Sequence, residues 1–128
     1  MRPRVDTRSK ILTPAGVGQI SCSLTLVTGY FDPLRAAHAR ELQQIRDRAP
    51  ARRLMVAVLT HASEVLDIGA RAELVAALRV VDYVVTVDHE DLDAFIERLR
   101  AGEVVRLERA DSDRTRQLIA DAQRSQNR

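Results

Sequence analysis

The 128-residue chain has no tryptophan, one lysine (Lys10) and one cysteine (Cys22), and aromatic residues make up only 3% of it. A single cysteine excludes an internal disulfide and is typical of proteins in reducing compartments. The scarcity of aromatic side chains and a net charge of only +2 argue against a dedicated nucleic-acid binder, which needs a basic stripe and stacking rings. We therefore expect a cytoplasmic protein with no nucleic-acid partner.

A membrane-spanning segment is also missing. Residues 11–31 carry no charge and follow a basic start, which superficially resembles a signal peptide or anchor. However, Pro14, Gly16 and Gln19 make this stretch too polar to cross a bilayer. We expect no membrane partner, and we interpret residues 1–21 as an irregular segment that leads into the first strand.

What the chain does contain is a regular alternation of short apolar runs and amphipathic segments. Strands are predicted at 22–27, 54–59, 82–87 and 103–108, and helices at 36–48, 70–80, 88–102 and 112–124. Strict alternation of strands and helices predicts an α/β fold, a Rossmann-like three-layer α/β/α sandwich with a parallel sheet of four to five strands. We expect one domain over residues 1–128, with a frayed tail at 124–128.

Finer expectations follow from the same periodicity. In the helix at 70–80, Leu74, Ala77 and Leu78 are expected to face the core, with Val81 continuing the same face. Gly102 is expected to stop the helix at 88–102. In the last helix, Ile119 and Ala122 are expected to face inward.

The segment GYFDPLRAAH (residues 29–38) joins the first strand to the first long helix. Gly29 is expected to permit a positive φ and a close approach of a ligand to the backbone. Arg35 and His38 lie three residues apart, so on one helix face they can reach the same anion, helped by the free N–H groups of the helix. The alternative is a tight turn in which His38 packs or caps locally, and the spacing alone leaves both interpretations open.

The same segment matches a family motif. The chain resembles the cytidylyltransferase-like nucleotidyltransferases, which carry G-x-F-D-x-x-H-x-G-H, and it looks most like the adenylyltransferase domain of ADP-heptose synthase and glycerol-3-phosphate cytidylyltransferase. KILT and RAELVAALRVVDYVVTVD also look like the heptose branch, and the resemblance covers roughly Lys10 to Arg100. It implies transfer of a nucleotide from CTP or ATP to a phosphorylated sugar or alcohol, with pyrophosphate release, assistance by Mg²⁺ and, often, a homodimer.

The resemblance assigns roles to individual residues. His38 matches the second motif histidine, which stabilises the transferring phosphate, and Arg71 matches an arginine before the helix that flanks the site. Thr115 matches a Ser/Thr-rich helix start that binds phosphates, unless the chain ends one strand–helix unit early. The residues that match the nucleotide-binding loop are Thr28, Gly29, Tyr30, Phe31 and Asp32.

Several positions depart from the family pattern. Arg35 replaces the first motif histidine, Ala37 replaces the motif glycine, and His61 stands where an acidic residue is usual. The sequence EVLDIG (residues 64–69) replaces a longer loop that carries a lysine. Arginine still binds phosphate, but it does not copy the placement of an imidazole.

The sequence therefore predicts that the Gly29–His38 loop binds a nucleotide or phosphate and that nucleotidyl transfer is weakened or lost. If transfer survives, Arg35 and His38 are the candidate catalytic residues. An active nucleotidyltransferase and a partner-binding pseudoenzyme are the alternatives. We predict no metal site on the protein, because a zinc site made of His38, His61 and His89 would lack any short paired spacing.

Overall fold

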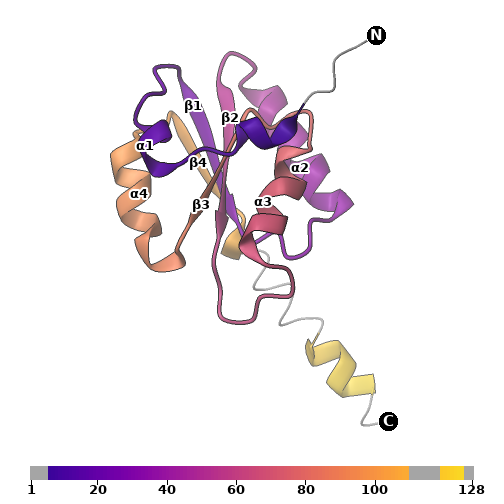
Figure 1. Cartoon of the computed structure of the whole chain (residues 1–128). Coiled ribbons are helices and arrows are strands. Elements are labelled where there is room, and N and C mark those ends of the chain that lie inside the picture. The colour runs from indigo at the N-terminus through magenta and orange to yellow at the C-terminus, as the bar shows by residue number, and fades with distance from the viewer. Residues whose placement is uncertain (1–5, 110–118, 126–128) are drawn as a thin grey trace.

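The computed structural model describes residues 6–109 and 119–125, and it contains a parallel four-stranded sheet with helices on both faces (Figure 1). The Rossmann-like α/β architecture predicted from the sequence is confirmed. The elements in chain order are η1 (Thr7–Lys10), α1 (Pro14–Val17), β1 (Leu24–Gly29), α2 (Ala36–Arg48), β2 (Arg53–Leu59), α3 (Ile68–Ala76), β3 (Tyr83–Val87), η2 (His89–Asp91), α4 (Leu92–Leu99) and β4 (Glu103–Arg106). Residues 119–125 are helical as well.

The sheet is buried on both faces, which explains why its strands are apolar runs and not alternating ones. In β2, Val56 and Val58 pack in the core cluster beneath α2 and α3, whereas Ala57 and Leu59 pack in the cluster on the side of α1 and α4. The segment before β1, expected to be irregular, contains two short helical turns, and Ile11 forms an isolated parallel bridge with Val84.

The strand order β3-β2-β1-β4 creates a switch point between β1 and β4. The chain builds outward from β1 to β3 and then crosses back to place β4 on the other side of β1. Just beyond β4, the Leu107 N–H donates to the Thr28 carbonyl over 2.8 Å. In open α/β sheets, ligands bind beyond the carboxyl ends of the strands at such a point, and the loop after β1 leaves the sheet there.

The expectation for the buried face of α3 was only partly right: Leu78 packs against the core and Val81 is buried, but the other two positions were wrong. Leu74 is 44% exposed and Ala77 is exposed, whereas Arg71 and Val75 are fully buried. The helix begins earlier than predicted, at Ile68, and its phase is set by a buried arginine that an apolar pattern does not reveal.

Two expectations about helix ends and faces were also wrong. Gly102 does not stop α4: the helix ends at Leu99, and Arg100 caps it in the left-handed conformation, with φ 52°. Ile119 is 54% exposed and Ala122 is exposed, so neither faces inward.

Gly29 is required by packing and not by an unusual backbone. It does not adopt a positive φ, so that expectation was wrong, and the left-handed residue is Phe31, with φ 51°. A Cβ atom at Gly29 would lie 2.8 Å from Cε2 of Phe31, whose ring is fully buried in the core. The absence of a side chain at Gly29 therefore makes room for the Phe31 ring.

We expect Gly29→Ala to lower the free energy of unfolding by about 1–3 kcal/mol, because the added methyl group overpacks a buried ring that has no space to retreat. The matched control is Gly18→Ala, since a Cβ there meets nothing closer than 3.6 Å on a helical backbone. Urea denaturation of the two variants checks this. Equal stabilities would show that the Phe31 ring does not need the space above Gly29.

Candidate active site

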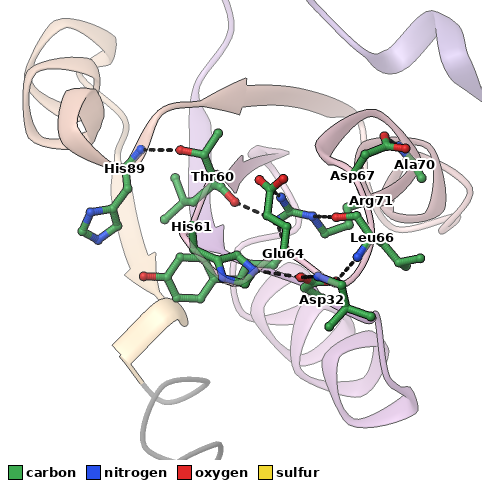
Figure 2. A network of polar contacts seen from close by, with 12 residues as sticks. Asp32, Thr60, His61, Glu64, Leu66, Asp67, Ala70, Arg71 and His89 are labelled. Atoms are coloured by element: carbon green, nitrogen blue, oxygen red, sulfur yellow. Dashed lines mark hydrogen bonds and ion pairs between the residues drawn. The ribbon is translucent and has the colours of Figure 1, made fainter.

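The loop after β1 is anchored by a buried carboxylate. The Asp32 side chain is 2% exposed and accepts hydrogen bonds from the N–H groups of Val65 and Leu66, over 2.7 and 2.8 Å, and from Nε2 of His61 over 2.8 Å (Figure 2). Burial alone raises the pKa of the Asp32 carboxyl, but the hydrogen bonds from the Val65 and Leu66 N–H groups and from His61 outweigh it, so its pKa lies below the ordinary value. Asp32 thus ties the loop after β1 to the loop after β2, and its peptide bond to Pro33 is cis.

A buried guanidinium holds the same two loops from inside the fold. Arg71 is fully buried, and its Nη1 donates to the carbonyls of Tyr30 and Leu59 over 2.8 and 2.7 Å. Its Nε donates to the Leu66 carbonyl over 3.0 Å, and its Nη2 forms an ion pair with Glu64 at 2.7 Å (Figure 2). Of the five N–H groups that an arginine carries, four are committed to these partners, so Arg71 shapes the site from beneath.

The first turn of α2 holds Arg35 and His38 next to each other through a local hydrogen bond. His38 is 3% exposed, and its Nδ1 accepts a hydrogen bond from the Arg35 N–H over 3.0 Å. Its ring also meets the Phe31 ring edge-on, with centroids 5.2 Å apart. The local packing and capping that the sequence left open are therefore present, and an Nδ1 that accepts leaves the proton of a neutral ring on Nε2.

Arg35 itself is exposed and is the N-cap residue of α2, which is 13 residues long. Serine, threonine or aspartate at this position would accept a hydrogen bond from the first turn, but a guanidinium carries only donors. The exposed, positively charged Arg35 is thus the residue that begins α2, and both a fixed positive charge and a helix N-terminus attract anions.

A second carboxylate lies at the switch point, and sequence reasoning missed it. Glu108 is 3% exposed; its Oε2 accepts from the Thr28 hydroxyl over 2.5 Å, and its Oε1 pairs with Nε of Arg106 at 2.7 Å. The hydrogen bond that the Arg106 guanidinium donates to the Glu108 carboxylate raises the pKa of Arg106. The signal in the sequence was a pair of opposite charges, Arg106 and Glu108, at the end of the strand predicted at 103–108.

Tyr30 belongs to a small ring cluster at the same edge. Its ring centroid lies 4.9 Å from that of His61 and 6.1 Å from that of His89. In the part of the chain that the structure describes, no three His, Cys, Asp or Glu side chains are grouped so as to hold a metal ion. Two of the three histidines considered for zinc, His61 and His89, therefore have ring contacts with Tyr30.

The other residues predicted for the site divide as follows. Phe31 is buried beneath the loop, and Thr28 is fully buried with its hydroxyl directed at Glu108. Thr115 lies outside the described residues, so its phosphate contact stays a prediction.

Comparisons with known proteins identify the family and agree with the fold. The cytidylyltransferase-like family model matches residues 26–124, so the chain belongs to the cytidylyltransferase-like family. The crystal structure of the lipopolysaccharide core biosynthesis protein from Thermoplasma volcanium GSS1 is similar with a TM-score of 0.58 and 20% identity, over 66% of this chain and 73% of that one. That likeness shows a common fold. No curated protein matches the chain, and none of the helices in the described ranges has the length and apolar character needed to span a membrane.

We expect Arg71→Leu to destabilise the fold by about 3–5 kcal/mol, because it strands buried carbonyls and the Glu64 carboxylate. The matched control is Arg79→Leu, an exposed arginine just beyond the same helix, for which we expect a change within about 0.5 kcal/mol. Thermal and urea denaturation check both variants. An Arg71→Leu protein as stable as the control would refute the anchoring role.

We expect Asp32→Asn to cost about 1–3 kcal/mol at pH 5–7, where the wild-type residue is a charged acceptor of three hydrogen bonds. Because folding lowers the pKa of Asp32, the stabilisation is complete above its unfolded value of about 3.9 and is lost as the pH falls through the lower folded value. The difference in unfolding free energy between the two proteins should shrink as the pH is lowered from 5 to 2.5. A difference that stays constant would contradict this assignment.

Proposed function

We propose that this cytidylyltransferase-like protein binds a nucleotide or a phosphate-bearing metabolite at the Gly29–His38 loop, and that its nucleotidyl transfer is weak or lost. The observation that carries the proposal is an exposed arginine, Arg35, at the N-terminus of α2, where no acceptor side chain caps the helix. This turn lies at the carboxyl edge of a parallel sheet, where ligands of such folds bind. The preferred ligand is CTP or ATP.

Weak transfer follows from what the neighbouring residues already do. Asp32 and Arg71, which match family site positions, are held by hydrogen bonds within the protein. Ala37 puts a methyl group where the family motif has glycine, and the described residues between 59 and 68 include no lysine. Removal of a single preorganised donor typically slows such chemistry about a hundredfold to a thousandfold.

A protein-bound Mg²⁺ does not fit this edge. The Asp32 carboxylate accepts three hydrogen bonds, and the Glu108 carboxylate is shared between Thr28 and Arg106. Any Mg²⁺ would therefore be held mainly by the phosphates of the nucleotide. We expect the protein to act in the cytoplasm, as a homodimer.

An active nucleotidyltransferase is the second candidate, and the adjacency of Arg35 and His38 at the start of α2 favours it. In that case, Arg35 and His38 would stabilise the charge that develops on the transferring and leaving phosphates.

Calorimetric titration with CTP and ATP, with and without Mg²⁺, tests binding. We expect Arg35→Ala to weaken binding about tenfold to a hundredfold, because it removes a charge-assisted contact worth about 1.5–3 kcal/mol. The matched control is Arg40→Ala, an exposed arginine one turn further along α2, which should bind normally. Failure of every nucleotide to bind would overturn the proposal in favour of a partner-binding role.

Pyrophosphate release in the presence of sugar phosphates or glycerol 3-phosphate tests transfer. We expect release from the wild-type protein to be no faster than from His38→Ala. Clear release that disappears in His38→Ala would instead establish the active enzyme.

A further inference from the structure

A second concave site lies at the opposite edge of the sheet. A cavity of about 590 Å³ opens where α1, the end of α4 and the first residues of β1 and β4 come together. These segments lie at the amino ends of the strands, away from the Gly29–His38 loop (Figure 1). The volume is within the range of about 300–1,000 Å³ that is usual for small-molecule sites.

The inner wall of the cavity is apolar. Val17 from α1, Leu24 from β1 and Phe95 from α4 line it and are at most 9% exposed. All three belong to the core cluster on this face of the sheet, and Leu99 and Ile20 extend the same surface. A ligand that enters here meets the side of the hydrophobic core.

The rim, in contrast, is cationic. Arg52, Arg98 and Arg100 contribute to the lining, which contains no acidic residue. Arg52 lies against the backbone of Gly102, where a Cβ would come within 2.9 Å of its Nε, and it makes a long ion pair of 3.6 Å with Glu103. Among the residues that the structure describes, Arg98 and Arg100 have no ion-pair partner, so the rim carries uncompensated positive charge.

Arg100 occupies its position at a conformational cost. It is the C-cap of α4 with φ 52° and ψ 48°, a left-handed conformation that glycine adopts without strain and that other residues adopt with difficulty. At this position the stability of the fold alone would favour glycine, but the chain has an arginine there, and its guanidinium is at the cavity. Strained residues of this kind are frequently found at ligand sites.

We propose that this cavity binds an amphipathic monoanion, a medium-chain alkyl carboxylate, whose chain lies on Leu24, Phe95 and Leu99. Its carboxylate pairs with the guanidinium groups of Arg98 and Arg100. Charge complementarity selects the anion, and the apolar side chains of the inner wall select a hydrocarbon chain. This site is separate from the proposed nucleotide site, because it lies at the other end of the strands.

Cys22, the sole cysteine of the chain, is exposed and lines the cavity, so it reports occupancy directly. We expect decanoate to slow alkylation of Cys22 by iodoacetamide in a saturable way. Octanoate should bind more weakly, by up to about fourfold for each methylene removed. Inorganic phosphate and decanol, which lack the chain and the charge respectively, should protect at least tenfold less well than decanoate, and CTP should not protect.

Arg100→Gly separates ligand binding from folding. We expect this variant to keep or raise the melting temperature, since glycine relieves the left-handed strain, and to weaken protection by decanoate at least fivefold. A double variant with Arg98→Gln should weaken it at least tenfold, while weak protection by decanol stays unchanged. The matched control Arg79→Gln, outside the cavity, should behave as wild type.

Three results would overturn the proposal. One is the absence of protection by decanoate at millimolar concentration, and another is equal protection in the wild type and the double arginine variant. The third is Cys22 reactivity that falls as the protein concentration rises, which would show that a second copy of the chain covers the cavity.

Discussion

The geometry of the carboxyl edge depends on the buried guanidinium of Arg71. A charge with no exposure to water is tolerated only when its N–H donors have hydrogen-bond acceptors. Here the acceptors are the backbone carbonyls of Tyr30, Leu59 and Leu66 and the carboxylate of Glu64. Asp32 then fastens the outside of the same loop through backbone N–H groups. Since both anchors are internal, the shape of the site is fixed before any ligand arrives.

The charged residues at the carboxyl edge of the sheet fall into two sets, those that bond within the protein and one that is exposed to solvent. Asp32, Arg71 and Glu108 each form hydrogen bonds with other groups of the protein, and these bonds give the loop its form. Arg35 is exposed, and with the first turn of α2 it presents positive charge to solvent. In the proposed function, such a site would keep the electrostatic attraction for phosphate while Asp32 and Arg71 are held by contacts within the fold, which is why affinity and turnover are expected to separate.

The order of strands and helices was predictable because each buried strand is a short apolar run and each helix has a clear period. The boundaries and faces that failed did so for identifiable reasons. The phase of α3 is set by Arg71, a charged residue whose burial depends on carbonyls distant in sequence, and no apolar pattern encodes that. Asp32 was predicted to contact a nucleotide because it matches the aspartate of the family motif. Its hydrogen-bond partners Val65 and Leu66 lie 33 and 34 positions further along the chain, where the motif gives no information. Gly29 was singled out for its backbone freedom, whereas the constraint that the structure shows there is the Phe31 ring.

The two departures from the family motif on α2 form one coherent change. A motif glycine lets a phosphate approach the backbone, and the methyl group of Ala37 closes part of that approach. Arginine is longer than histidine, so in the proposed site Arg35 would meet an anion farther from the helix than His38, which is 3% exposed and accepts from the Arg35 N–H. Each substitution would displace the anion outward, so the two are compatible with binding. In-line transfer is less forgiving, since a misplacement of about 1 Å can cost about a hundredfold in rate, and the loop could thus keep a nucleotide while losing the alignment that makes it react.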